Sequence, residues 1–202
     1  MAQEKKEIAN VNVFALIENG KTQEAITWIK KNPKCINCKK PGEWTVLMEA
    51  AMNGNAEIVK LLINTPLVGR KDEDSFTALM FAAGQGHEKC VAILSKTREL
   101  GMDRGKIGET ALTIAALNGE TKCVKILAKT KEIGMRTSDG STALMLAAIE
   151  GYHDCVRILV NTKEIGMKNK YDKTALQQVL KLRENGNSDN NIKKCIEILN
   201  NH

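Results

Sequence analysis

A block of about 33 residues repeats along this chain, and that period constrains the fold more than any other feature. A threonine that precedes an apolar segment recurs at intervals of 32, 33, 32 and 32 residues: Thr45, Thr77, Thr110, Thr142 and Thr174. A glycine follows nine residues after each of the first four, at Gly54, Gly86, Gly119 and Gly151. A fixed period of this length is typical of a solenoid, whose units cannot bury an apolar face alone. Each unit is therefore expected to stack on its neighbours.

Each block has the pattern of two helices separated by a tight turn. In residues 142–160, apolar side chains recur at helical spacing on both sides of Gly151. Thr142 is a natural N-cap for the first helix, because its hydroxyl can accept a backbone N–H of the first turn. A third shared phrase follows the second helix: it reads Lys-Thr-Arg-Glu-Leu-Gly-Met at 96–102, with close variants at 129–135 and 161–167. The pattern predicts an all-α fold with extended loops between helix pairs.

These residues resemble the ankyrin repeat, in which a Thr-Pro-Leu-His opening is followed by two alanines. The opening here reads Thr-Ala-Leu-Met at Thr77 and Thr142, which is similar to the version common in protist ankyrin-repeat proteins. The proline and histidine of the opening are missing from every unit, and the family's Gly-His turn occurs only at Gly86-His87. The resemblance covers residues 11–202 and implies an ankyrin-repeat solenoid of helix-turn-helix units joined by hairpin loops.

The repeats divide the chain into about six units, two of which are caps. Residues 1–10 are polar and are expected to be frayed or disordered. Residues 11–202 are expected to form a single ankyrin-repeat domain: an N-terminal cap at 11–44, repeats at 45–76, 77–109, 110–141 and 142–173, and a C-terminal cap at 174–202. The cap at the C-terminus contains a polar insertion at 183–191, so its second helix is expected to begin near Ile192.

The composition predicts an intracellular protein without a membrane span. Lysine and arginine exceed the acidic residues by 30 − 24 = 6, and the sequence pI is about 9.0. This mild balance permits an acidic partner without requiring nucleic acid. No apolar run of about 18 residues occurs, and the N-terminus lacks the apolar core of a secretory signal. We expect a monomer located in the cytoplasm, with the nucleus as a further compartment.

The six cysteines are expected to be free thiols. Cys90, Cys123 and Cys155 hold equivalent positions in successive units. Stacked helices lie about 8–10 Å apart, whereas a disulfide needs Cα atoms within about 7 Å. Cys35-Ile-Asn-Cys38 is the one spacing that could hold a metal, but a structural zinc site needs a second pair of ligands and the sequence contains no second Cys-x-x-Cys. We therefore predict no metal and no cofactor.

The sequence predicts no catalytic residues. It contains no glycine-rich phosphate loop, no nucleophile elbow and no His-Glu-x-x-His. The three histidines, His87, His153 and His202, are not arranged with a carboxylate and a nucleophile in any recognisable pattern. The chain is therefore expected not to be an enzyme.

A row of cations is predicted on the hairpin loops, where the ankyrin resemblance implies partner contacts. The position six residues before each repeat threonine is basic in all five units: Lys39, Lys71, Arg104, Arg136 and Lys168. An acid follows directly only at Asp72. If the hairpins stack in register, these five cations form a basic ladder, and the last four are assigned as the contacts that would steer an acidic partner. A solvated face explains the same residues equally well, because lysine is frequent at this position in ankyrin repeats.

Aromatic and apolar residues are predicted to complete this surface. Three of the seven aromatic residues fall in the hairpins: Trp44, Phe76 and Tyr171. Trp and Tyr are enriched among interface hot spots, although packing within the loops explains the aromatic residues as well. On the first helices, the position two residues before the turn glycine is apolar at Met52, Leu117 and Ile149. These side chains would form a strip suited to a peptide or a helix.

The function expected from these features is a non-catalytic scaffold that binds a partner protein on its concave face and hairpin tips. A nucleic-acid-associated protein that uses the basic ladder is the alternative, but the modest net charge and the dispersed acidic residues oppose it. A regulatory or inhibitory subunit, or an assembly chaperone of an enzyme, would be a scaffold with one particular partner. The partner is expected to be a protein that is acidic on its contacting surface, and no membrane is expected.

Overall fold

The structure, a computed structural model, describes residues 13–33, 36–185 and 189–202. It divides into two compact units, which are described separately: unit 1 extends to Met102, and unit 2 begins at Asp103. Residues 1–10, which are expected to be frayed, lie outside the described residues, and so does Cys35.

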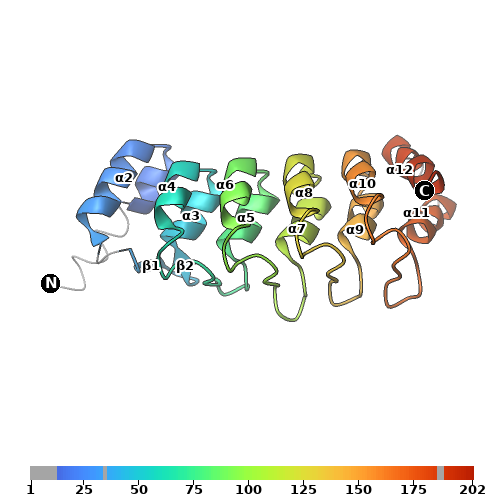
Figure 1. The fold of residues 1–202 in the computed structure, drawn as a ribbon, viewed down its shortest axis with the longest axis horizontal. Coiled ribbons are helices and arrows are strands. Elements are labelled where there is room, and N and C mark those ends of the chain that lie inside the picture. The colour runs from blue at the N-terminus through green and yellow to red at the C-terminus, as the bar shows by residue number, and fades with distance from the viewer. Residues whose placement is uncertain (1–12, 34–35, 186–188) are drawn as a thin grey trace. The chain divides into compact units, whose positions relative to one another are not determined.

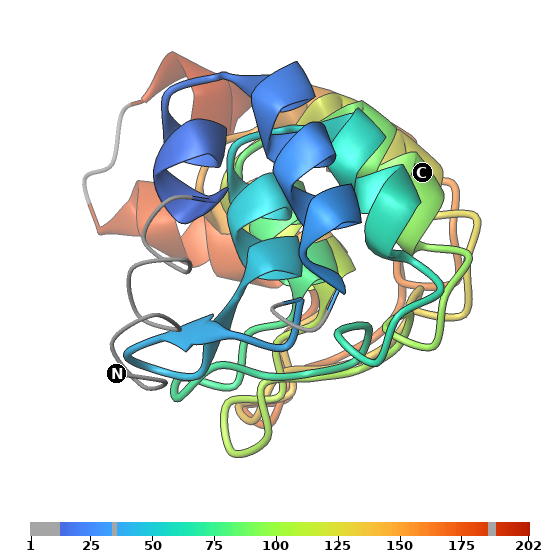
Figure 2. The ribbon, with the colours of Figure 1, turned by 90° about the vertical axis from the view of Figure 1, so that its left-hand side faces the viewer.

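Unit 1 alternates helix pairs with hairpin loops (Figure 1). Residues 13–18 are helical, and they are followed by α2 (Thr22–Lys31), β1 (Lys39–Lys40), β2 (Trp44–Thr45), α3 (Val46–Met52), α4 (Ala56–Leu62), α5 (Ala78–Gly84) and α6 (Glu88–Leu94). Helix α3 packs against α5, and α4 packs against both α2 and α6. First helices therefore contact first helices, and second helices contact second helices. Figure 2 views unit 1 from its N-terminal side and shows the β1–β2 hairpin projecting from the helices.

Unit 2 has the same plan. Its helices are α7 (Ala111–Leu117), α8 (Thr121–Leu127), α9 (Ala143–Ile149), α10 (His153–Leu159), α11 (Ala175–Glu184) and α12 (Asn190–Asn200). Helix α9 packs against α7 and α11, and α10 packs against α8 and α12. The predicted architecture, in which helix pairs repeat along the chain and stack on one another, is confirmed within each unit.

The repeat threonine begins each first helix as the sequence predicts. Its hydroxyl accepts a hydrogen bond from the backbone N–H three residues later, at 3.2 Å from Met48 to Thr45 and at 3.4 Å from Thr113 to Thr110. Thr77, Thr142 and Thr174 make the same bond. A helix leaves its first N–H groups without intrahelical partners, and the threonine satisfies one of them.

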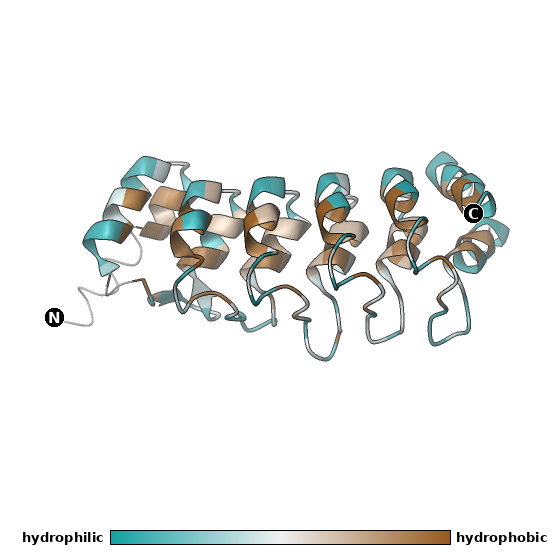
Figure 3. Ribbon diagram, in the orientation of Figure 1, coloured by the Kyte–Doolittle hydropathy of each residue, from teal (hydrophilic) through white to brown (hydrophobic). Residues whose placement is uncertain are grey.

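Small and branched apolar side chains fill the core of each unit. Cys90 in unit 1 and Cys123 and Cys155 in unit 2 are fully buried at equivalent positions. They act as small hydrophobic residues, as their spacing predicts. The five cysteines within the described residues are all free thiols. Figure 3 shows the hydrophobic residues concentrated within the helix pairs and hydrophilic residues on the hairpins and helix ends.

A buried glutamate joins consecutive repeats. The Glu99 side chain is 1% exposed, and its two oxygens accept the backbone N–H of Gly69 in the preceding repeat at 2.8 Å and of Leu79 in its own repeat at 2.7 Å. Glu164 makes the two equivalent bonds in unit 2. Removal from water raises the pKa of both carboxyl groups, although the backbone N–H donors oppose that change. The glutamate of the third shared phrase is therefore a structural connector between repeats.

Neighbouring hairpin loops are also joined by backbone hydrogen bonds. The bonds run from Glu73 to the Gly42 carbonyl at 3.1 Å in unit 1, and in unit 2 from Ser138 to Ile107 at 2.7 Å and from Lys170 to Asp139 at 3.0 Å. Equivalent residues of adjacent hairpins are consequently held close together within each unit.

The C-terminal cap differs slightly from the prediction. Helix α11 continues to Glu184, and α12 begins at Asn190 rather than near Ile192. The earlier start has a clear cause: the Asp189 side chain accepts the backbone N–H of Asn191 at 2.8 Å and acts as the N-cap.

Candidate protein-binding surface

Two of the predicted hairpin cations are ion-paired in unit 2. Arg104 Nη1 lies 2.7 Å from Glu109 Oε2, and both side chains are 17% exposed. Lys168 Nζ lies 2.9 and 3.1 Å from the two Asp172 oxygens. The counter-charge thus comes four or five residues after the cation and not from the next residue. These pairs lower the net positive charge of the hairpins.

Arg136 connects two hairpins of unit 2. Its guanidinium donates to the Gly140 carbonyl at 3.3 Å within its own hairpin and to the Lys168 carbonyl in the next. The Arg136 side chain is exposed, so it holds neighbouring loops together at the surface.

In unit 1 the first hairpin cations also have acidic partners. Lys39 pairs with Glu43, and Lys40 contacts Glu18 and lies 3.0 Å from Glu49. Burial alone would lower the pKa of the Lys40 ammonium, but hydrogen bonds to these two glutamates raise it above the ordinary value of 10.5. Lys40 therefore stays charged at neutral pH. Lys71, the predicted contact in the next hairpin, is half-buried.

Three aromatic rings gather on unit 1. The Trp44 and Phe81 ring centroids are 4.6 Å apart with the rings inclined by 60°, and Phe76 stacks on Phe81 at 5.0 Å and 22°. Such tilted and offset-stacked pairs are favourable aromatic geometries. All three side chains are half-buried, so each keeps part of its surface in contact with solvent. We call Trp44, Phe76 and Phe81 the aromatic patch.

The Trp44 ring is held in place by a buried carboxylate. Glu49 is only 5% exposed, and its Oε2 accepts the indole Nε1–H of Trp44 at 2.7 Å as well as the Lys40 ammonium. The other oxygen of Glu49 accepts the Asn53 side-chain amide at 2.9 Å. Glu49 is thus a buried charge with several donors, as such a group requires. The Trp44 side chain is oriented before any partner binds.

Matches to a family described as "Ankyrin repeats (3 copies)" cover residues 13–105, 97–172 and 114–199. The chain belongs to the ankyrin-repeat family. No curated protein matches it significantly. Ankyrin repeats are generally protein–protein interaction modules and are typically not catalytic, so a surface that binds protein is the kind of site to look for. Among the described residues, no helix is both long and apolar enough to span a membrane.

The ankyrin turn histidine has a structural role. His87 Nε2 makes a hydrogen bond with the Met52 carbonyl at 2.9 Å, and a Cβ added at Gly54 would lie 2.6 Å from the imidazole. In unit 2 the Tyr152 ring covers Gly119 in the same way.

The described part of the chain contains no cluster of three or more His, Cys, Asp or Glu side chains that could hold a metal.

The other predicted contacts are exposed to different degrees in this ankyrin array. Tyr171 is 73% exposed at a hairpin of unit 2. Leu117 and Ile149 are half-buried on α7 and α9, which pack against each other. Met52 is half-buried on α3, and the equivalent residue of α5 is Gly84. Leu117 and Ile149 therefore lie on neighbouring helices of unit 2, whereas Met52 lies in unit 1, where the next repeat has no side chain at this position.

Phe81 is the functional candidate that the sequence reasoning missed. It lies four residues after Thr77 on α5, the first helix of its repeat, and it connects two hairpin aromatics that are 32 residues apart. The equivalent positions carry Glu49, Ile114, Leu146 and Gln178. A comparison of this one position between repeats would have singled out Phe81.

Proposed function

We propose that the chain is a non-catalytic scaffold that binds a partner protein through its hairpin loops and the first helices of its repeats, with the aromatic patch as the main anchor. The observation that carries this proposal is the fixed, partly exposed Trp44 ring between Phe81 and the Glu49 carboxylate. A side chain that is already ordered loses little conformational entropy on binding. Tryptophan is also one of the residue types enriched among binding hot spots.

Tyr171 and the apolar strip formed by Met52, Leu117 and Ile149 are proposed as additional contacts. The 73% exposure of Tyr171 leaves most of that ring free to meet a partner. The strip residues are half-buried, which suits them to contact an apolar face of a peptide or helix.

The cations Lys71, Arg104, Arg136 and Lys168 are proposed to steer a partner that is acidic on its contacting surface. Rim charges of this kind act mainly on the association rate and on its salt dependence. The ion pairs of Arg104 and Lys168 favour protein over nucleic acid as the partner, because less positive charge remains to replace counterions on phosphates. A steep fall in affinity with salt would support the nucleic-acid alternative.

A scaffold of this kind includes a regulatory or inhibitory subunit and an assembly chaperone of an enzyme, and either would use the same surface. The thiols of the described residues are free and mostly buried, which supports a reducing, intracellular location.

The proposal can be tested by comparing two tryptophan variants. Partners are captured from the source cell with the wild type, Trp44→Ala and Trp28→Ala, and identified by mass spectrometry. Trp28 is the matched control because it is the only other tryptophan and lies on α2, outside the aromatic patch. A partner is then purified and its affinity is measured by calorimetry.

Trp44→Ala should weaken the binding of a verified partner by about 2 kcal/mol, or about thirtyfold in affinity, which is typical of a hot spot. Trp28→Ala should bind as the wild type does, and circular dichroism should show that both variants are folded. Reversing the charges of Arg104, Arg136 and Lys168 should slow association. If a partner binds all of these variants with wild-type affinity and rate, the proposed surface is wrong.

A further inference from the structure

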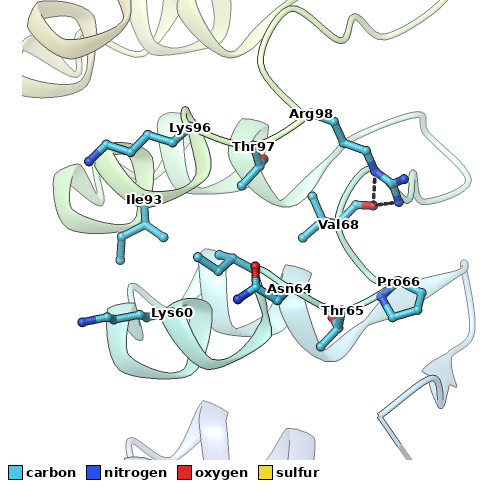
Figure 4. Close-up of a pocket in the computed structure, with 10 residues that line it drawn as sticks. Lys60, Asn64, Thr65, Pro66, Val68, Ile93, Lys96, Thr97 and Arg98 are labelled. Carbon is cyan, nitrogen blue, oxygen red and sulfur yellow. Dashed lines mark hydrogen bonds between the residues drawn. The ribbon is translucent and has the colours of Figure 1, made fainter.

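A groove with a volume of about 930 Å³ lies on unit 1, between α4 and α6 and the loops that follow them (Figure 4). It shares no lining residue with the aromatic patch. Ile63 and Ile93 are half-buried and contribute apolar surface to the groove. Val68, which is 5% exposed, lies at the end of the groove near Arg98.

The rim of the groove is positively charged. Figure 4 shows that Lys60 and Lys96 extend to the same end of the groove, with Ile93 between them. Both lysine side chains are exposed. Arg98 lies at the other end, where its Nε donates to the Val68 carbonyl at 2.9 Å. Of the described residues that line the groove, three are basic and none is acidic.

Part of the apolar surface of the groove differs from the later repeats. Ile63 occupies a position where the next two repeats carry the smaller Ser95 and Ala128 and the fourth carries Val160. The position of Ile93 is an isoleucine in the later repeats as well, at Ile126 and Ile158. Pro66 likewise replaces a basic residue, since Arg98, Lys131 and Lys163 occupy the equivalent position in the later repeats. The repeat pattern therefore does not require the apolar side chains of Ile63 and Pro66 at these two positions.

We propose that this groove binds an acidic peptide segment of a partner protein, with an apolar side chain against Ile63 and Ile93 and carboxylates beside Lys60 and Lys96. Charge complementarity determines the choice of occupant: two exposed ammonium groups at one end attract carboxylates, and no carboxylate of the lining competes for them. An exposed ion pair contributes little by itself. The apolar side chain and the carboxylates are consequently both required.

The binding test uses the full chain and three fluorescein-labelled synthetic peptides of equal length. In the first peptide, acidic residues (Asp and Glu) alternate with Leu. The second peptide has Ser in place of each Leu, and the third has Asn and Gln in place of Asp and Glu. Fluorescence anisotropy should show saturable binding of the first peptide and binding at least about tenfold weaker for the other two. Added salt should weaken binding of the first peptide.

Substitutions then locate the site. Lys60→Glu combined with Lys96→Glu should lower the affinity for the first peptide by about tenfold or more. Lys125→Glu combined with Lys129→Glu is the matched control, because these exposed lysines belong to unit 2 and the change in net charge is the same. Ile63→Ser, which introduces the residue that the next repeat carries at Ser95, should fold and should also weaken binding by about tenfold.

The proposal is overturned if the first peptide does not saturate, if it binds no more tightly than the peptide with amides or the peptide with serines, or if the Lys60/Lys96 variant binds as the wild type does. An equal loss in the Lys125/Lys129 control overturns it too, because it would show a response to net charge alone. Trp44→Ala should leave peptide binding unchanged. Failure of the groove and failure of the aromatic patch are therefore distinguishable.

Discussion

Glu164 joins two consecutive repeats of unit 2, because one of its carboxylate oxygens accepts the backbone N–H of Gly134 at 2.7 Å. The other oxygen accepts the N–H of Leu144 at 2.8 Å, in the first turn of α9. The chain is directed to this position by Thr162, whose hydroxyl donates to the Leu159 carbonyl at the end of α10 and accepts the N–H of Glu164. Thr162 and Glu164 thus satisfy backbone groups at the end of α10 and in the first turn of α9, and Glu164 also connects two repeats.

Replacing Glu164 with glutamine should destabilise unit 2 by about 2 kcal/mol, the usual cost of leaving a buried donor unsatisfied. The N–H groups of Gly134 and Leu144 face separate oxygens of Glu164, and glutamine would place an NH2 donor against one of them and leave that N–H without an acceptor. Urea unfolding followed by circular dichroism measures the change. Glu197→Gln on the exposed face of α12 is the control and should leave the free energy of unfolding within about 0.5 kcal/mol of the wild type. Equal effects of the two substitutions would contradict the structural role of Glu164.

The two buried glutamates, Glu99 and Glu164, should make the free energy of unfolding depend on pH. Burial raises the pKa of Glu99 and Glu164 above the ordinary value of 4.5. A raised pKa in the folded state means that the folded chain binds the proton more tightly than the unfolded chain. The resulting stabilisation is fully present below pH 4.5 and is lost as the pH rises through the folded-state pKa.

The measurement is urea unfolding of the wild type and of the double variant Glu99→Gln, Glu164→Gln, from about pH 4.5 to about pH 7. The difference in unfolding free energy between the two proteins should shrink as the pH rises. A difference that stays constant or grows would show that these two carboxyl groups do not have raised pKa values.

The helix pairs could be predicted from the sequence because their signals are local. Thr45 and its equivalents cap the helices that follow them, and the glycines occupy the turns. The role of Glu99 could not be predicted in this way, since the shared phrase is visible in the sequence but its bond to Gly69 joins residues 30 apart. Ordinary expectation also places glutamate at the surface.

The candidate site was predicted in part. The hairpin position of Trp44 and Phe76 is visible in the sequence, but the contact of both rings with Phe81 on a helix is not. The charge of Arg104 could not be judged from its immediate neighbour, because the hairpin folds back and brings Glu109 against it. Contacts across a loop depend on its backbone path, which residue types alone do not specify.

Gly119→Ala should destabilise unit 2 more than Gly20→Ala destabilises unit 1. Both glycines have positive φ, +74° and +69°, so each alanine costs about 1–2 kcal/mol in backbone strain. A Cβ at Gly119 would also lie 2.5 Å from the Tyr152 ring, whereas a Cβ at Gly20 would meet no atom within 4 Å. We expect an additional cost of about 1–3 kcal/mol at Gly119. Thermal unfolding measures both variants, and Tyr152→Ala in the Gly119→Ala background should recover the additional part.

The thiols should react in two classes that follow their burial. Burial raises the pKa of Cys90 and Cys195 to about 11, and it raises the pKa of Cys155 as well. The thiolate is the reactive form, so these side chains should react with Ellman's reagent only when the chain unfolds. Cys38 is half-buried and should react in the folded protein.

A Cys35→Ser variant makes this count unambiguous, because it removes the one cysteine outside the described residues. Its native form should show one fast thiol, and Cys38→Ser added to it should abolish the fast phase. The wild type, unfolded without reductant, should show all six thiols of the sequence. A count of four or fewer would mean that a disulfide exists. Fast reaction of more than one thiol in the native variant would mean that the helix pairs open readily in solution. Such opening would contradict the complete burial of Cys90, Cys123 and Cys155.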